Sequence, residues 1–307
     1  MSEQPPRPVL VTGAAGFVGS HLVRALRAHG RPVRALVRDA RRAEGLEGAE
    51  VVEGDVTRPE TLRDAFAGVD AVVHLVAILQ GRPEDFDRVI AGGTRHAVDA
   101  ARGAGVRRFV YVSALGLNEH SRATIPYFRG KADAEEAVAA SGLEHVILRP
   151  SFVTSPDGGA FPLFVRLARL TPVTPIVGSG TQRIQPIWID DETEIIVRAL
   201  DEPAAADRTI DVAGPDAVDW NELWRRLKRA LGIRRPSVHV PMALMRAQAP
   251  LLERLPKPPV TRNELLMLEG GDNTGDVRPL VETFGVPLTP LDEQLRRVAA
   301  GSRRSRS

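Results

Sequence analysis

An apolar run, a glycine-rich turn and an amphipathic segment follow one another at the start of the chain. Residues 8–12 lead directly into Gly13, Gly16 and Gly19, and residues 20–29 have the apolar spacing of a helix. In this order the first glycine allows a tight turn, the second lets backbone approach a pyrophosphate, and the third lets the helix pack closely on a sheet. The phosphates then lie at the amino end of the helix, where unpaired N–H groups and the helix dipole face them. The order predicts a dinucleotide-binding turn; an ordinary turn that needs small residues for packing is the alternative.

Apolar runs alternate with helical segments through the first half of the chain. This alternation predicts an α/β fold, in which a doubly wound parallel Rossmann sheet is covered by helices on both faces. The predicted strands are 9–11, 33–37, 51–52, 71–77, 108–113 and 145–148, and the predicted helices are 20–29, 59–66, 85–104 and 127–141.

The pattern loosens after Arg149 and Pro150, where prolines recur at short intervals. We therefore expect a Rossmann domain over residues 1–154 and mainly a smaller substrate lobe over residues 155–307. Residues 187–213 still have the pattern of a helix and a strand, and we expect them to return to the main sheet.

Composition excludes several kinds of protein. The 307 residues are 43% apolar, which is enough for a sizeable core, and the absence of cysteine excludes disulfides and thiolate chemistry. The seven histidines form no metal-type cluster, and 41 basic residues nearly balance 39 acidic ones, so we expect neither a metal site nor a nucleic-acid partner. A signal-like start and an apolar run of roughly 20 residues are also absent, which predicts a cytoplasmic protein.

Two segments near the C-terminus leave a peripheral contact open. Residues 242–255 place leucines and methionines among arginines. Three uses of such a segment stay open: packing on the main domain, covering an apolar pocket, or resting on a membrane surface. Residues 301–307 contain only Gly, Ser and Arg, and we expect a frayed tail.

Tyr127 and Lys131 stand four residues apart at the start of a predicted helix, so their side chains share one face. An ammonium group near a phenol favours the phenolate, which lets a tyrosine act as general acid or base near neutrality. The pair is a candidate proton-transfer site; two ordinary residues of a helix surface are the alternative. His74 lies within an apolar strand and is expected to be a hydrogen-bonded core residue, and His96 a residue of a helix surface.

These motifs resemble the short-chain dehydrogenase/reductase superfamily in its extended or atypical branches, the NAD(P)-dependent epimerase/dehydratase type. The resemblance rests on TGAAGFVG at residues 12–19, on Asp55 after the third strand and on the YFRGK sequence at residues 127–131. The C-terminal part, through residues 214–215 and 283–286, resembles bacterial relatives of the nucleotide-binding accessory subunit of respiratory complex I.

The resemblance implies a role for each matching residue. Tyr127 would be the proton donor, Lys131 would contact the nicotinamide ribose, and a serine or threonine after the fifth strand would hold the substrate oxygen. Ser113 is the candidate for that serine, although alignment of the strand places Ala114 at the family's position. The implied cofactor contacts are Gly13, Ala15, Gly16, Phe17 and Val18 at the pyrophosphate, Asp55 and Val56 at the adenine, and Leu75, Val76 and Ala77 beside the ribose.

The end of the second predicted strand indicates which cofactor binds. Arg38 precedes Asp39 there, and an arginine accommodates a ribose 2′-phosphate, whereas an acidic residue pairs with a free 2′-hydroxyl. We therefore expect NADP, with NAD as the alternative in which Asp39 makes the contact. Arg183 is a candidate for pairing with an anionic substrate, or else a solvated loop arginine.

The favoured function is an NADP(H)-dependent oxidoreductase that transfers a hydride to or from an unidentified small-molecule carbonyl or hydroxyl substrate. Two alternatives stay open. One is a weakly catalytic or non-catalytic nucleotide-binding module that associates with a respiratory or quinone complex. The other is a nucleotide-sugar epimerase or dehydratase.

Overall fold

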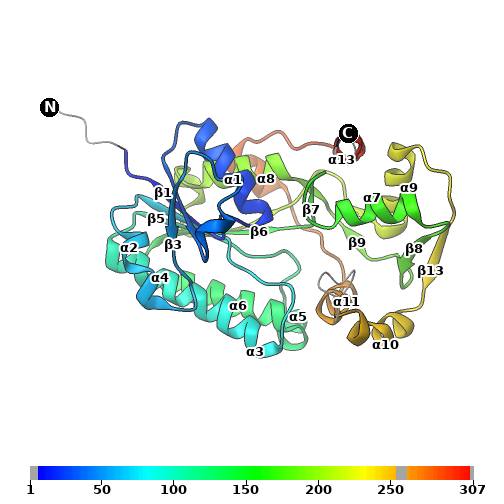
Figure 1. Ribbon diagram of the computed structural model, residues 1–307, viewed down its shortest axis with the longest axis horizontal. Coiled ribbons are helices and arrows are strands. Elements are labelled where there is room, and N and C mark those ends of the chain that lie inside the picture. The colour runs from blue at the N-terminus through cyan, green and yellow to red at the C-terminus, as the bar shows by residue number, and fades with distance from the viewer. Residues whose placement is uncertain (1–5, 254–260, 305–307) are drawn as a thin grey trace.

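Seven parallel strands form the central sheet of the computed structural model, which describes residues 6–253 and 261–304 (Figure 1). In spatial order they are β3 (Glu50–Glu53), β2 (Val33–Val37), β1 (Val9–Thr12), β4 (Ala71–His74), β5 (Arg108–Val112), β6 (Glu144–Pro150) and β11 (Arg208–Val212). The strand order reverses between β1 and β4, and open α/β sheets bind ligands at such a switch point, outside the carboxyl ends of the strands. The predicted doubly wound parallel sheet is confirmed.

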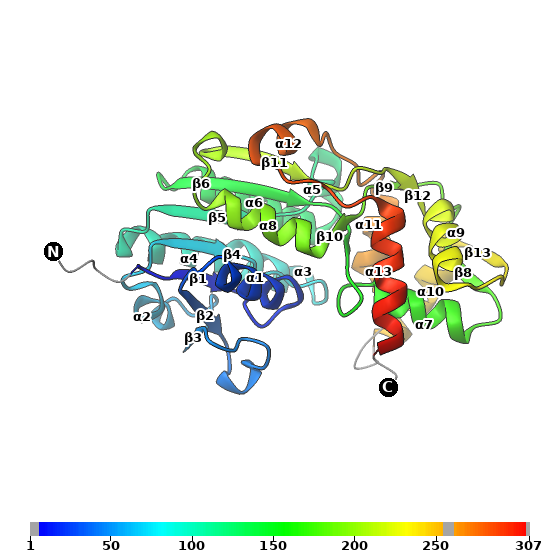
Figure 2. The same cartoon turned by 90° about the horizontal axis from the view of Figure 1, so that it is seen from above.

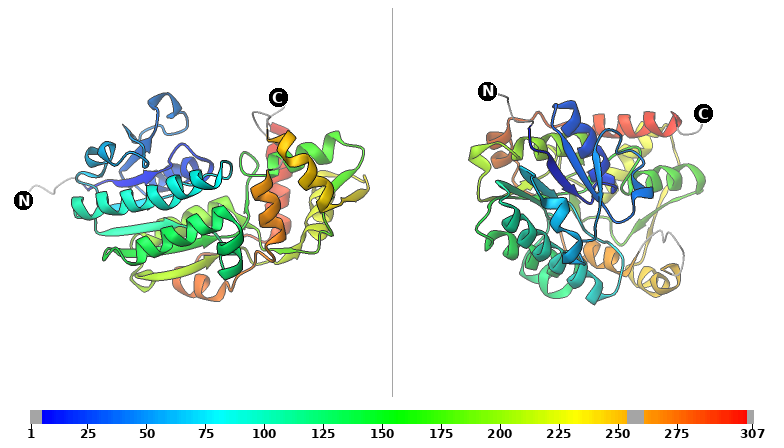
Figure 3. Two further views of the ribbon diagram at one scale, coloured as in Figure 1. Left: turned by 90° about the horizontal axis from the view of Figure 1, so that it is seen from below. Right: turned by 60° about the vertical axis from the view of Figure 1, so that its left-hand side comes forward.

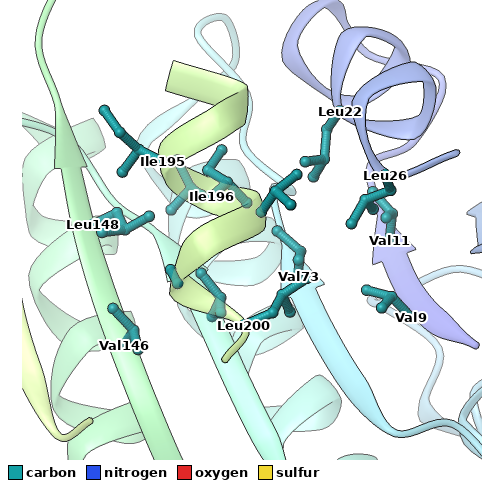
Figure 4. Packing of buried hydrophobic residues seen from close by; sticks show 14 of the residues in the cluster. Val9, Val11, Leu22, Leu26, Val73, Val146, Leu148, Ile195, Ile196 and Leu200 are labelled. Carbon is teal, nitrogen blue, oxygen red and sulfur yellow. The ribbon is translucent and has the colours of Figure 1, made fainter. Parts of the chain in front are cut away.

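Helices cover both faces of the sheet, and alternate side chains of each strand supply two separate cores. Val9 and Val11 of β1 belong to the first core, whereas Leu10 between them belongs to the second. Figure 4 shows the first core, where β1, β4 and β6 meet α1 and α8. The covering helices are α1 (Phe17–Ala28), α8 (Ile189–Ala199) and α12 (Arg278–Phe284) on the first face, and α2 (Arg63–Phe66), α4 (Gly93–Ala104) and α6 (Pro126–Ala139) on the second.

Two of the predicted helices are divided in the structure. Residues 59–66 form a short 3₁₀ turn, η2 (Pro59–Thr61), followed by α2. Residues 83–104 form α3 (Pro83–Phe86), a wider π-helical turn η3 (Asp87–Gly92) and then α4. The spacing of apolar residues predicts a helix here, but it does not reveal that the turn at residues 87–92 is wider than an α-helical turn.

The second lobe lies beside the carboxyl ends of the strands, at the end of the molecule remote from the N-terminus (Figures 2 and 3). Its aromatic and aliphatic core is separate from the two cores of the sheet. Its elements are β7 (Val153–Thr154), α7 (Phe161–Leu170), β8 (Thr174–Val177), β9 (Arg183–Ile184), β10 (Ile187–Trp188), β12 (Val218–Asp219), α9 (Trp220–Leu231), β13 (Ser237–Val240), α10 (Met242–Leu252), α11 (Arg262–Glu269) and α13 (Leu291–Arg304). The apolar and basic segment 242–255 lies largely in α10, and its residues 254 and 255 lie outside the described part of the chain.

Within the described residues, no helix is long and apolar enough to cross a membrane. The same part of the chain also holds no cluster of three or more histidine, aspartate or glutamate side chains placed to bind a metal ion.

A buried carboxyl group in the first turns of α8 lacks hydrogen-bond partners among the described residues. Glu192 is 1% exposed, and neither of its oxygens has a hydrogen-bond partner among the described residues. Burial raises the pKa of this carboxyl from its ordinary 4.5 to about 8. Ile189, Ile195 and Ile196 of the same helix are buried as well, so Glu192 stands in an apolar stripe.

Candidate functional site

The turn between β1 and α1 needs glycine at two positions. Gly13 has a φ of 73°, and a methyl group there would lie 3.3 Å from the Leu75 carbonyl carbon, where the end of β1 passes the end of β4. A methyl group on Gly19 would overlap the Gly13 carbonyl oxygen. These two glycines therefore set the tight turn and the close approach of α1 to the turn.

The corner above this turn is open backbone. Ala15 and Gly16 are exposed, and α1 begins after Gly16 without a side-chain cap. The first N–H groups of a helix need partners from outside the helix, and the positive end of its dipole favours an anion. The geometry therefore fits a nucleotide pyrophosphate.

The second lobe contacts this corner through Phe17. Gly158, in the loop after β7, lies so close to the Phe17 ring that an added methyl group would overlap it. Gly159 also lies near the ring, and its φ is 64°. Phe17, with the half-buried Val18 beside it, thus joins the phosphate corner to the lobe, a contact that the sequence did not reveal.

Arg38 and Asp55 flank the position expected for the adenosine. Arg38 is exposed after β2, while the neighbouring Asp39 caps the short helix η1 (Ala40–Arg42) and binds the Arg41 side chain at 3.0 Å. Burial works to raise the pKa of Asp55, but hydrogen bonds from Thr57 and the charge of Arg38 lower it overall. Asp55 is therefore an anion near the Arg38 guanidinium.

The residues after β3 and β4 complete this side of the switch point. Val56 is buried, and its carbonyl oxygen lies 2.8 Å from the His96 Nδ1 atom. Leu75 and Val76 are half-buried, and Ala77 is exposed. The Leu75 N–H donates to the Thr12 carbonyl at 3.2 Å, which holds the ends of β1 and β4 together.

His74 is a core residue, as expected. Its two ring nitrogens lie 2.7 Å from the Thr12 hydroxyl and 3.2 Å from the Thr94 hydroxyl. Burial, with a smaller effect of the Lys131 charge, lowers the pKa of His74 to about 3. The ring is therefore neutral at physiological pH and ties β1 to α4.

Tyr127, Lys131 and Ser113 gather at the carboxyl end of β5. Both residues of the helix pair are buried, and the Lys131 Nζ atom donates to the Val112 carbonyl at 2.7 Å. Ser113 follows directly, is 3% exposed, and its hydroxyl has no hydrogen-bond partner among the described residues. The Lys131 Nζ atom lies 5.9 Å from the centre of the Tyr127 ring.

Burial dominates the electrostatics of this group. It lowers the pKa of Lys131 to about 7, against an opposing effect of Glu135. It raises the pKa of Tyr127 above its ordinary value. Burial, and not the charge of the lysine, thus determines the pKa of Tyr127, and the phenol carries its proton. A protonated tyrosine suits proton donation, the step that carbonyl reduction requires.

An ion pair supports the helix that carries the pair. Glu135 lies one turn after Lys131 on α6, and the Arg149 Nε atom donates to its carboxylate at 2.9 Å. Arg149 lies near the carboxyl end of β6, so this pair ties α6 to the end of the sheet beside the lobe.

Asn273, which no motif of the sequence indicates, joins the lobe to the same end of the sheet. Its Nδ2 atom donates to the Leu115 carbonyl at 2.7 Å, and its Oδ1 atom accepts from the Ser151 hydroxyl at 2.7 Å. Its backbone N–H donates to the carbonyl of Arg183 at 2.8 Å. Arg183 itself is exposed on β9, so this candidate substrate residue is linked to the site through Asn273.

Comparison with known proteins agrees with this geometry. Residues 13–170 match the model of a family described as NAD(P)H-binding. The chain is 34% identical over 238 residues to ceramide reductase of Caulobacter vibrioides, which covers 76% of this chain and 73% of that protein. It is 27% identical over 328 residues to 2-alkyl-3-oxoalkanoate reductase of Stenotrophomonas maltophilia, with 96% and 99% covered.

A similar solved structure is that of MoeE5 in complex with UDP-glucuronic acid and NAD. It has 25% sequence identity and a TM-score of 0.75, and the match covers 97% of this chain and 99% of that one. The resemblance to the accessory subunit of complex I receives only loose support from these matches.

Proposed function

This chain belongs to the NAD(P)H-binding family within the short-chain dehydrogenase/reductase superfamily, and on that basis we propose that it uses NADPH to reduce a ketone on a substrate with long alkyl chains. The observation that carries the proposal is the grouping of Tyr127, Lys131 and the unpartnered Ser113 hydroxyl at the end of β5. This group lies one strand away from the switch point that fits the pyrophosphate.

When bound, the cofactor would supply the hydride that adds to the carbonyl carbon. Tyr127 donates its phenolic proton to the carbonyl oxygen, so that the ketone becomes a secondary alcohol and the tyrosine becomes a phenolate. Lys131, held by the Val112 carbonyl, stabilises that phenolate by its charge. Ser113 donates a hydrogen bond to the same substrate oxygen, because no other group of the described chain binds its hydroxyl.

Two observations support an alkyl substrate. The relatives are named for ceramide and for 2-alkyl-3-oxoalkanoates. On the lobe side, the half-buried Phe152 follows β6 and lies within 6.0 Å, centre to centre, of the rings of Phe161, Phe164 and Trp220. Phe161 is fully buried, so the half-buried rings of Phe152, Phe164 and Trp220 offer the apolar wall, rather than partners for a sugar diphosphate. Arg183 is then a contact for an acidic group at the polar end of the substrate.

Arg38 supports NADPH as the cofactor. Its side chain is exposed at the end of β2, whereas Asp39 is engaged by Arg41. An exposed guanidinium at this position binds a 2′-phosphate through paired hydrogen bonds.

The test of this function uses the two tyrosines of the chain. Tyr127→Phe and Tyr111→Phe each remove one buried phenolic oxygen, and the Tyr111 hydroxyl has no hydrogen-bond partner among the described residues. Consumption of NADPH is followed with alkyl 3-oxo acids. Conversion of UDP-glucose, which consumes no net NADPH in an epimerase or dehydratase, is followed by chromatography of the nucleotide sugars to test that alternative. We expect Tyr127→Phe to lower kcat by roughly 10²–10⁴, the usual contribution of a general acid, and Tyr111→Phe to leave it unchanged. Normal turnover by Tyr127→Phe contradicts the assignment, and conversion of UDP-glucose alone favours the alternative.

A further inference from the structure

The distal end of the second lobe is basic, although the whole chain is nearly neutral. Residues 158–182 contain Arg166 and Arg169 and no acidic residue. Residues 223–252 contain seven basic residues and again no acidic one. These segments form α7, β8 and most of α9, together with β13 and α10, and Figure 2 shows β8, β13 and α9 at the end remote from the sheet. Positive charge is therefore concentrated at one end of the molecule.

Exposed apolar side chains are concentrated at the same end. Nine large apolar residues are exposed in the described part of the chain, and five of them lie here. Leu170 is 61% exposed, Leu251 66%, Leu244 48%, Val238 47% and Val173 37%. Isolated exposed leucines are ordinary, but a group of them marks an interaction surface.

The strand pair β8–β13 provides the flat part of this surface. In the parallel register Val238 lies beside Pro175, and Val240 beside Val177. Ile176, which points to the opposite face, belongs to the lobe core. The outer face of this two-stranded ribbon therefore carries only apolar side chains, and those are half-buried or exposed.

Basic groups lie directly against these apolar residues. The Arg235 guanidinium donates to the carbonyls of Arg169 and Thr171 at 2.6 Å, next to Leu170 and Val173. The Lys228 Nζ atom donates to the Arg235 carbonyl at 2.9 Å.

Acidic groups neutralise only the flanks of the surface. Arg246 of α10 pairs with Glu269 of α11, so α10 contributes leucines rather than charge. Arg225 and Arg226 pair with Glu222 at the start of α9. Arg229, at the end of α9, and Arg234, before β13, are exposed cations of the surface.

We propose that this surface docks on an anionic phospholipid membrane. Leucine and valine side chains enter the interfacial layer while arginines contact the lipid phosphates, the combination typical of peripheral membrane binding. A second copy of the chain is disfavoured, because the same face on both partners would bring like charges together. A nucleic acid would leave the exposed leucines unexplained. The inference does not depend on the proposed reduction, since membrane binding is measured without substrate.

The test is co-sedimentation of the full chain with lipid vesicles. We expect binding to vesicles of phosphatidylcholine mixed with phosphatidylglycerol, weaker binding as salt is raised, and little binding to phosphatidylcholine alone. Arg229→Gln with Arg234→Gln should weaken binding about 30-fold, since each basic group at a membrane contributes roughly fivefold. Leu170→Gln with Leu244→Gln should also weaken it, by about tenfold or more.

The matched control combines Val281→Gln with Arg102→Gln. Both side chains are exposed on helices of the Rossmann domain, and neither lies in the surface described above. The control should bind vesicles as the unmodified chain does, and NADPH binding by every variant verifies the fold. Absence of binding to anionic vesicles at low salt overturns the proposal, as does equal weakening by the control. Binding to immobilised polyglutamate but not to vesicles overturns it in favour of an acidic protein partner.

Discussion

Replacement of Glu192 by glutamine tests the buried carboxyl of α8. In the folded chain this carboxyl is protonated below a pKa of about 8, whereas in the unfolded chain it ionises near 4.5. The folded state therefore binds the extra proton between these two values, and the free energy of unfolding must fall as pH rises through that window. Glutamine has the same shape and does not ionise.

The expected difference follows from this linkage. Each pH unit in the window changes the free energy of unfolding by at most about 1.4 kcal/mol. Glu192→Gln should therefore match the unmodified chain near pH 4.5 and exceed its stability at pH 8 by about 4 kcal/mol. Urea unfolding at several pH values, monitored by tryptophan fluorescence, measures the difference.

The difference between the pH profiles of Glu192→Gln and the unmodified chain reports the titration of Glu192 alone, because both proteins share all other titrating groups. Glu60→Gln, which removes an exposed carboxyl, is the control and should leave the profile unchanged. Parallel profiles for Glu192→Gln and the unmodified chain from pH 5 to 8 would refute the reasoning.

Two further predictions concern the nucleotide corner. Arg38→Ala should weaken NADPH binding roughly 10- to 100-fold, which is the contribution of hydrogen bonds to a charged group, and should leave NADH binding unchanged. The control Arg102→Ala should change the binding of neither cofactor. An equal loss of affinity for NADPH and NADH in a calorimetric titration would show that Arg38 does not bind the 2′-phosphate. Gly158→Ala should destabilise the chain by about 1–3 kcal/mol, because its methyl group overlaps the Phe17 ring. Gly103→Ala is the control, because Gly103 lies in the helix α4 with open space around it; this substitution should stabilise the chain by about 0.5–1 kcal/mol in urea unfolding. Destabilisation by both Gly158→Ala and Gly103→Ala would show that the overlap at Phe17 is not the cause.

Local features of the fold were predictable from the sequence. The turn from β1 to α1 depends on neighbouring residues, so glycine spacing and apolar pattern suffice to place it. His74 was also predictable, because a histidine inside a fully apolar strand has few partners other than core hydroxyls. The division of residues 83–104 by a π-helical turn was not predictable, because the apolar period survives the extra residue.

Long-range features were not predictable in the same way. Asn273 lies 158 residues from Leu115 along the chain, and nothing near it in the sequence indicates that contact. The packing of α12 on β11 and α8 depends equally on the folded topology. Glu192 did leave a signal, because it falls within the apolar stripe of α8, where a charged residue is out of place.

The central claim is that the chain reduces a carbonyl with NADPH. It is tested most directly with NADPH that carries deuterium at the transferable C4 position, incubated with a long-chain alkyl 3-oxo acid. We expect a secondary alcohol with deuterium on the carbinol carbon, formed in step with NADP⁺, and loss of this product in Tyr127→Phe. Tight binding of NADPH with no labelled alcohol across the substrates would contradict it.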